Sequence, residues 1–350
     1  MAKADDLDRA YERRQQGLPA YVPGEAMTDE DRARFRAAFL QEQEKKFVAR
    51  FVRADEVEVQ PVDWLVEDWL ARDSLAGLVG PSGSCKTFVA IDWACSIATA
   101  TRWLGNAAAP GAVFILAGEG RNGLRKRIEG WSRHRQVPIE GAPLYLASQL
   151  PRIDQLTTTA IMDEVDALVQ ESGVPPALVV IDTVARAIAG DENSSEHMGL
   201  LVQCADWIRE RFPGCTVLLV HHTGHGDSGR ARGSSAFYAA LDSEALAKPL
   251  KSGDVQLHAT KCKDWAPPAP MQLCRQAVPI TVPGLDKPTS TLVMVATEVE
   301  SIADRISRRN EINQLKAEGK SIRAIADETG VPRSTVARMV NDDREAGFDD

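Results

Sequence analysis

The chain has 350 residues, 44% of them hydrophobic, and a formal net charge of −9 at neutral pH. This length fits two domains, or one large domain with an appendage, and the acidic balance argues against a basic exterior that coats duplex DNA. No apolar run is long enough to span a membrane, no cleavable signal opens the chain, and the six cysteines include no CxxC pair. We therefore expect a cytoplasmic protein with neither a disulfide framework nor a zinc site.

A polar, charge-rich leader occupies residues 1–60. Thr28 and the three acidic residues after it predict the start of a mixed-charge helix that continues to about Phe51. We interpret the leader as a solvated segment or a docking arm. An aromatic and apolar segment from Pro61 to Leu70 then leads into the first strand of the core.

Residues 75–94 combine an apolar strand, a tight glycine-containing turn and a helix, which is the context that a phosphate-binding loop requires. Backbone N–H groups in such a loop and at the helix N-terminus attract an anion. Lys86 would add a positive charge for the β- and γ-phosphates of ATP, and the Thr87 hydroxyl would be a ligand for Mg²⁺. The residues predicted to bind the nucleotide are Gly80, Pro81, Ser82, Gly83, Ser84, Cys85, Lys86 and Thr87.

Cys85 departs from the usual pattern, which has glycine immediately before the lysine. One interpretation is a reactive thiol, because a helix N-terminus and the adjacent Lys86 both favour the thiolate. The other interpretation is that this position has ordinary helical dihedrals and tolerates a small side chain.

Strands and helices alternate after this loop. Strands are predicted over residues 112–117, 144–147, 177–182 and 217–222, and helices over residues 122–134, 157–169 and 198–211. Strands that are apolar throughout and alternate with helices indicate an α/β fold, in which a mostly parallel sheet is covered on both faces.

A glycine-rich, polar and basic loop spans residues 224–235. Further strands are predicted near residues 243–247, 255–261, 271–280 and 291–296. Turn residues separate them, so we expect these strands to form an antiparallel extension of the sheet.

Three polar side chains are predicted at the carboxyl edge of the sheet, where ligands of such folds bind. Asp182 ends one apolar strand and suits the Mg²⁺ side of a nucleotide site, His222 ends another, and Glu119 follows a third. The group that activates water must come from elsewhere than the residue after Asp182, because that residue is Thr183. Glu119 is the candidate, and the alternative is that it is a solvated loop residue.

Several segments together resemble RepA-type hexameric helicases, which belong to the RecA/DnaB-like class of plasmids and phages. The resemblance extends from about Trp64 to Val295 and rests on GPSGSCKTFVAIDWA, FILAGEG, LVVIDTVARA, DENSSEHMG, LLVHHTG, RARGSSA and HATKCKD. It implies a RecA-like ATPase core that forms a homo-hexameric ring around single-stranded DNA. It also implies catalytic roles for Lys86, for Glu119 as the activator of water, for Asp182 as the metal anchor with Thr87, and for His222 as the sensor of the γ-phosphate.

The same resemblance implies residues that act between neighbouring subunits. Arg232 resembles the arginine that reaches into the site of the next subunit, and Arg230 is a rival for that role. Lys261 and Lys263 resemble basic strand-end residues that sense the neighbouring nucleotide, unless they are simply solvated lysines. The loop from Gly224 to Arg232 would face the channel and follow the phosphate backbone of single-stranded DNA.

The last segment has no strand pattern and predicts three short helices, over residues 305–317, 321–328 and 333–341. Ala326, Gly330 and Val336 have the spacing of the small residue, turn glycine and buried aliphatic residue of a helix-turn-helix, and Ile325, Val331 and Met339 fill its other buried positions. Eight basic residues against four acidic ones give residues 305–341 a net charge of +4. The segment looks like the DNA-binding end of a resolvase-type recombinase, and it binds duplex DNA or docks a protein.

These observations predict a leader over residues 1–60, a RecA-like ATPase domain over 61–300 and a helix-turn-helix domain over 303–345. The function that we favour is an ATP-driven motor on single-stranded DNA, a ring-forming replicative helicase of a plasmid, phage or prophage. An ATP-switched DNA-binding regulator and a RecA-like recombination mediator are the alternatives. Closed rings and open filaments both use head-to-tail contacts, so the sequence does not distinguish them.

Overall fold

The computed structural model describes residues 52–118, 121–224, 235–281, 289–297 and 302–329, together with residues 331, 333 and 336. The helix predicted before Phe51 lies outside the described residues. The chain divides into two compact units, Met1–Ala296 and Thr297–Asp350. No helix among the described residues is both long and apolar enough to cross a membrane.

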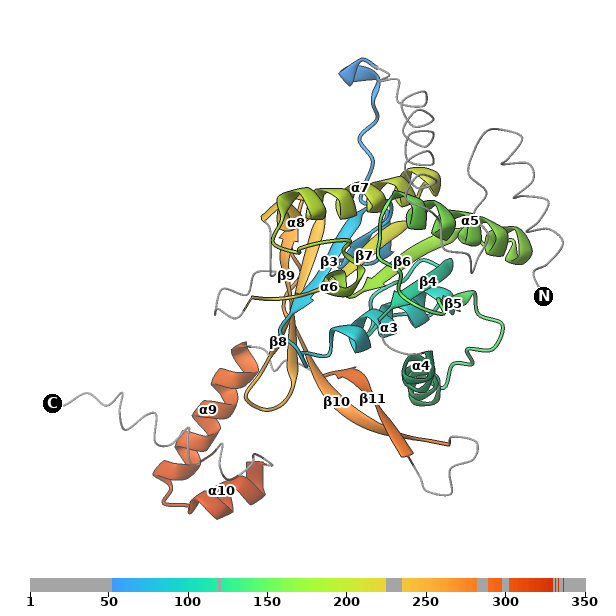
Figure 1. Ribbon diagram of the computed structural model, residues 1–350. Coiled ribbons are helices and arrows are strands. Elements are labelled where there is room, and N and C mark those ends of the chain that lie inside the picture. The colour runs from blue at the N-terminus through green and yellow to red at the C-terminus, as the bar shows by residue number, and fades with distance from the viewer. Residues whose placement is uncertain are drawn as a thin grey trace, which may run out of the picture. The chain divides into compact units, whose positions relative to one another are not determined.

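A nine-stranded sheet forms the centre of the first unit, with the strand order β11-β10-β9-β8-β3-β7-β6-β4-β5 (Figure 1). The strands are β3 (Leu75–Gly80), β4 (Ala112–Ala117), β5 (Leu144–Leu146), β6 (Pro176–Asp182), β7 (Thr216–His222), β8 (Ser243–Pro249), β9 (Val255–Cys262), β10 (Met271–Ile280) and β11 (Thr289–Ala296). The predicted antiparallel extension is confirmed for β9, β10 and β11. It is wrong for β8, which pairs parallel with β3 and so belongs to the parallel core.

Helices cover both faces of this sheet (Figure 1). They are α3 (Lys86–Ala98), α4 (Arg121–Arg135), α5 (Gln155–Ser172), α6 (Val184–Ala187), α7 (Ser195–Arg211) and α8 (Ser235–Ala240). One core lies under α3 and α4, and the other lies under α5 and α7. Successive residues of β3 alternate between the two cores, with Leu78 in the first and Leu75 and Val79 in the second. The predicted α/β fold with a mostly parallel, doubly covered sheet is confirmed.

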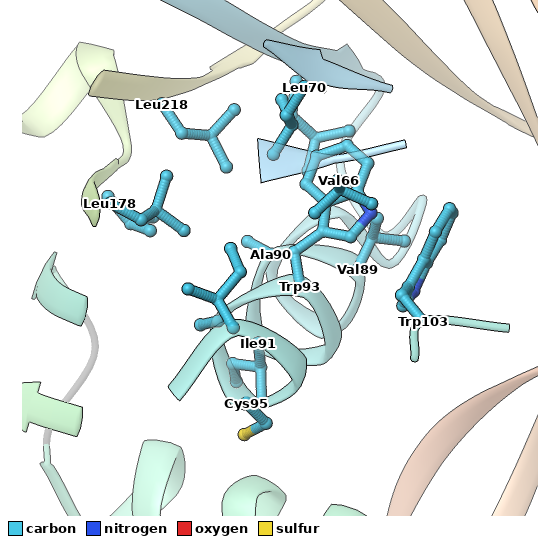
Figure 2. Packing of buried hydrophobic residues seen from close by; sticks show 14 of the residues in the cluster. Val66, Leu70, Val89, Ala90, Ile91, Trp93, Cys95, Trp103, Leu178 and Leu218 are labelled. Carbon is cyan, nitrogen blue, oxygen red and sulfur yellow. The ribbon is translucent and has the colours of Figure 1, made fainter. Parts of the chain in front are cut away.

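The helix after the phosphate loop, α3, is buried on nearly every side (Figure 2). A short antiparallel pair, β1 (Trp64–Val66) and β2 (Leu70–Ala71), closes over it. Trp93 and Trp103 are fully buried in an edge-to-face contact, with ring centroids 5.5 Å apart. Burying a large apolar side chain stabilises a fold by about 2–3 kcal/mol, so this packing firmly anchors the helix that carries Lys86 and Thr87.

A buried carboxylate joins α3 to α4. Asp92 accepts hydrogen bonds from the indole N–H groups of Trp131 at 2.6 Å and Trp103 at 3.0 Å, and Arg135 lies 3.5 Å away. Burial raises the pKa of Asp92, and the nearby Arg135 opposes that shift. These partners compensate for the desolvation of the carboxylate.

Beyond Leu273, β10 has no pairing with β9 and continues with β11 as a two-stranded arm beside α4 (Figure 1). Residues 273–280 pair with residues 289–296 along this arm. The arm packs closely on α4, because a side chain at Gly130 would meet the Thr291 methyl carbon at 2.1 Å. Arg133 also donates to the carbonyl oxygen of Pro279 at 3.4 Å.

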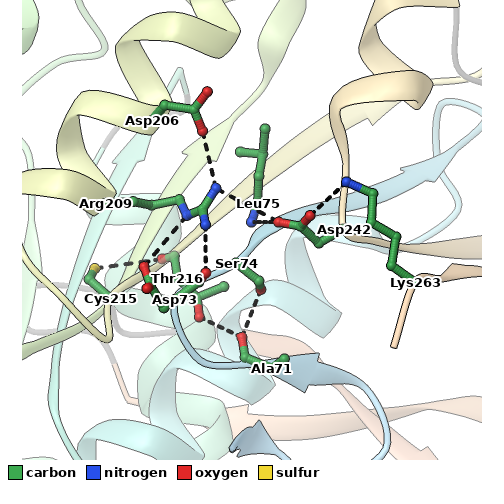
Figure 3. A network of polar contacts seen from close by, with 10 residues as sticks. All are labelled: Ala71, Asp73, Ser74, Leu75, Asp206, Arg209, Cys215, Thr216, Asp242 and Lys263. Carbon is green, nitrogen blue, oxygen red and sulfur yellow. Dashed lines mark hydrogen bonds and ion pairs between the residues drawn. The ribbon is translucent and has the colours of Figure 1, made fainter. Parts of the chain in front are cut away.

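A polar network lies at the amino edge of the sheet, where β3 begins, opposite the carboxyl edge (Figure 3). Asp242 accepts the backbone N–H of Leu75 at 2.8 Å and forms an ion pair with Lys263 at 2.8 Å. Arg209 from α7 lies 3.1 Å from Asp206 and 3.7 Å from Asp242. These contacts tie the start of β3 to α7 and to the residue that follows β9.

The second unit contains α9 (Ile302–Ala317) and α10 (Ile322–Thr329). A small core gathers Ile312, Leu315, Ile325, Ala326, Val331 and Val336. Gly319 follows α9 with φ +83°, a backbone conformation that favours glycine at a helix C-terminus. Two predicted helices are therefore present, and most of the third, with Gly330 and Met339, lies outside the described residues.

Candidate nucleotide-binding site

The phosphate loop joins the carboxyl end of β3 to the N-terminus of α3. Gly80 has no room for a side chain, because a Cβ atom there would lie 2.5 Å from the carbonyl oxygen of Ala247 and 2.6 Å from Ser84 Oγ. Gly83 has φ +78°, which glycine adopts without strain. Both glycines are thus required by the shape of the loop.

Cys85 has φ +63° and ψ +19°, in the left-handed region. The interpretation that this position has ordinary helical dihedrals is therefore wrong. A non-glycine residue in this region costs about 1–2 kcal/mol, which explains why the usual pattern has glycine here. The thiol is partly buried, and Sγ lies 3.9 Å from the carbonyl oxygen of Gly83.

Lys86 is buried, with 5% of its surface exposed. Its ammonium group donates to the carbonyl oxygens of Gly80 and Pro81, each at 2.9 Å. Burial lowers the pKa of Lys86 to about 8, and the negative charge of Asp182 partly offsets that effect. The ammonium is held inside the loop, where it can meet an incoming phosphate.

Thr87 of α3 and Asp182 of β6 come together although β3, the strand that leads into α3, is separated from β6 by β7. The Thr87 hydroxyl donates to Oδ2 of Asp182 at 2.6 Å, and Asp182 is buried at the end of β6. The peptide bond between Asp182 and Thr183 is cis. A hydroxyl and a carboxylate oxygen beside a lysine are suitable ligands for Mg²⁺ with a nucleotide, so these residues fit the predicted metal site.

His222 lies beside the same lysine. Gly80 and His222 are paired residues of the adjacent strands β3 and β7, and His222 Nδ1 is 3.2 Å from the Lys86 ammonium. The preceding His221 is fully buried against the ring of Phe237 in α8, at 5.1 Å between ring centroids. The structure therefore brings Lys86, Thr87, Asp182 and His222 together at the carboxyl edge.

Two predicted catalytic residues, Glu119 and Arg232, lie outside the described residues, as do Arg230 and the loop residues 225–234. The last described residue before Glu119 is Gly118, whose N–H donates to the backbone oxygen of Asp182 at 2.7 Å. The chain thus leaves β4 beside the end of β6. Arg186 donates to the carbonyl oxygen of Gly118.

Lys261 and Lys263 lie away from this site, toward the amino edge of the core. Lys263 pairs with Asp242, and Lys261 donates to the carbonyl oxygens of Tyr238 at 2.6 Å and Ala239 at 3.1 Å. Each lysine therefore has protein partners in addition to solvent.

Two arginines near the site were not predicted. Arg186 is part of the quoted segment LVVIDTVARA, so its position just after Asp182 was a usable signal. Arg275 donates to the carbonyl oxygen of Gly83 at 3.4 Å from 192 residues further along the chain. No local pattern marks Arg275, because only the path of β10 brings it to the loop.

Comparison with known families gives two matches. Residues 41–228 match the family described as AAA domain, and residues 305–341 match the family described as helix-turn-helix domain. The first match covers more than half of the chain. No curated protein matches the chain.

Proposed function

The chain belongs to the AAA-domain family of P-loop ATPases, and from this membership we propose that it is an ATP-driven motor on single-stranded DNA. The finer proposal is a ring-forming replicative helicase of a plasmid, phage or prophage, located in the cytoplasm. An ATPase domain together with a helix-turn-helix domain indicates nucleotide-driven activity on DNA.

The observation that carries this proposal is the convergence of Lys86, Thr87, Asp182 and His222 at one edge of the sheet. The parallel core followed by an antiparallel extension is consistent with a RecA-like core. β7 places His222 beside Lys86 and then continues into the loop proposed to face DNA. A single strand thus links the nucleotide site to the proposed DNA contact.

P-loop ATPase domains of this family generally bind ATP with Mg²⁺. We assign the phosphates to the loop and Lys86, and the metal to Thr87 and Asp182. When bound, Mg²⁺ neutralises charge on the phosphate oxygens. The Lys86 ammonium would then leave the loop carbonyl oxygens and His222 and bind phosphate oxygens instead. His222 would sense the γ-phosphate through the loss of its contact with Lys86.

Hydrolysis requires a group that activates water, and we assign this role to Glu119. We assign to Arg232 the stabilisation of transition-state charge in the neighbouring subunit, an effect that typically adds ~10³-fold or more to turnover. Lys261 and Lys263 lie far from their own phosphate loop, which suits residues that serve a neighbour in a head-to-tail homo-hexamer.

The experiment that tests the proposal measures assembly and unwinding together. Mass photometry with ATP and single-stranded DNA should show hexamers, and a forked duplex should be displaced only when ATP is hydrolysed. ATP-dependent DNA binding without displacement would favour the ATP-switched regulator. Filaments of variable length on single-stranded DNA would favour the recombination mediator.

A further inference from the structure

The two-stranded arm of β10 and β11 brings one arginine to the phosphate loop. β10 pairs with β9 only through residues 271–273, and Arg275 is the second residue beyond that pairing. At this point the strand passes the carboxyl edge of the sheet, where the phosphate loop begins. The Nη2 atom of Arg275 lies 3.4 Å from the carbonyl oxygen of Gly83.

The surroundings of Arg275 leave its guanidinium available to a ligand. Its side chain is exposed, and Gly83 is exposed with no atom within 4 Å of the position of a Cβ. Within the described part of the chain, the contact with Gly83 is the single hydrogen bond of the Arg275 side chain, and no acidic side chain pairs with it. Among contacts with the described residues, only one of the five guanidinium N–H groups is used, so four can bind a ligand.

The backbone of Arg275 is held firmly by the arm. Arg275 pairs with Met294 of β11, whose side chain is buried in the core shared with α3 and α4. The close approach of Gly130 to Thr291 fixes the arm on α4. Arg275 therefore has a firmly held backbone and an exposed guanidinium beside the loop.

We propose that Arg275 is a nucleotide-binding residue, supplied by β10 to the phosphate loop of its own subunit, whose guanidinium contacts the phosphate groups of ATP. Lys86 is the one cation inside the described loop, and it is buried beneath the loop carbonyls. A triphosphate carries several negative charges, and a guanidinium binds phosphate oxygens through parallel hydrogen bonds. Arg275 would approach the phosphates from the solvent side and Lys86 from the protein side.

This inference rests on the proposed function, since it requires ATP in the loop. The test is calorimetric titration of the full chain with MgATP and, separately, with tripolyphosphate. For Arg275→Ala we expect about tenfold weaker binding of both ligands, because a hydrogen bond to a charged group is lost. Arg275→Lys should recover part of the loss for both, since it restores the charge but not the paired donors.

Arg133→Ala is the matched control, because it removes an exposed arginine that contacts the same arm but not the loop. It should bind both ligands like the wild type, and Arg275→Ala should melt like the wild type without ligand. Weaker MgATP binding with unchanged tripolyphosphate binding would overturn the phosphate contact. Unchanged binding of both ligands, or a lower melting temperature without ligand, would overturn the role of Arg275. A wild-type chain that binds neither ligand would overturn the ATPase function as well.

Discussion

The ammonium group of Lys86 lies 3.2 Å from Nδ1 of His222, within hydrogen-bonding distance. This contact joins the buried cation of the phosphate loop to the end of the strand that leads to the proposed DNA-facing loop. The same ammonium is held by the carbonyl oxygens of Gly80 and Pro81. A phosphate that attracts Lys86 therefore competes with His222 for one charged group.

ATP binding should weaken as the pH rises above about 8. Burial lowers the pKa of Lys86 to about 8, so the lysine is charged below that pH and loses its charge above it. An anion prefers the charged form, so the affinity is full well below pH 8 and should fall by up to about tenfold by pH 9. Titration of MgATP between pH 7 and pH 9.5 measures this. Lys86→Arg keeps its charge throughout, so any affinity that it retains should not depend on pH, and a flat wild-type profile would contradict the role of Lys86.

Glu119→Gln should keep ATP binding and abolish turnover, whereas Lys86→Ala should lose binding. The amide cannot accept a proton from water, but it preserves the size of the side chain. Calorimetry measures the binding, and phosphate release measures the turnover. Glu140→Gln is the control, because Glu140 is an exposed glutamate in the loop before β5. ATP hydrolysis at the wild-type rate by Glu119→Gln would show that another group activates water.

Subunits that carry Arg232→Ala should inactivate the ATP hydrolysis of wild-type subunits assembled beside them. Each site would borrow this arginine from its neighbour, so a mixture with the wild type should lose more activity than dilution alone predicts. Steady-state ATPase rates across a series of mixing ratios measure this. Arg230→Ala, two residues away, is the matched comparison, and mixing it with the wild type should leave the ATPase rate unchanged. A linear fall with the fraction of Arg232→Ala would rule out a shared site, and a steep fall with Arg230→Ala would transfer the role to Arg230.

Arg333→Ala combined with Arg338→Ala should weaken duplex DNA binding and leave ATP hydrolysis unchanged. Both arginines belong to the predicted third helix, with Ser334 and Thr335, whose side chains would reach a groove. Each lost phosphate contact should reduce the slope of log affinity against log salt by about 1. Lys320→Ala is the control, because Lys320 already pairs with Glu328 at 2.7 Å. An unchanged duplex affinity and salt slope would favour a protein-docking role for this unit.

Alkylation of Cys85 should abolish ATP hydrolysis, and ATP with Mg²⁺ should protect the thiol. Sγ lies at the phosphate loop, next in sequence to Lys86, so an adduct would occupy space near the nucleotide. Cys85→Gly should be active and resistant, because glycine adopts the left-handed conformation observed here.

Mass spectrometry with activity measurements checks the Cys85 prediction. Cys262 and Cys274 are also partly accessible and serve as internal controls. Burial raises the pKa of Cys215 to about 12 and that of Cys204 to about 11, so both should react slowly. Complete alkylation of Cys85 with surviving ATPase activity would show that its side chain points away from the phosphates.

The sequence by itself determined the elements whose signals are local. The segments that form β4 and β10 were predicted with the bounds that the structure shows, because the residue pattern of each strand and the turn residues that bound it are local in the sequence. The phosphate loop was also predicted from the sequence, since the strand, the glycines, the lysine and the threonine follow one another directly along the chain. The short helices α6 and α8 were missed, because four and six residues carry too little periodicity to predict a helix.

Only the tertiary structure decided which strand lies beside which, and in what direction. β8 is parallel to β3 because the chain passes from β7 through α8 before it enters the sheet again. The residues of β8 carry no pattern that indicates this connection or the direction of the strand. The contacts of Thr87 with Asp182 and of Arg275 with Gly83 join residues 95 and 192 positions apart. Such contacts depend on the summed packing of the sheet and its helices, so the short-range patterns that predict individual elements do not contain them.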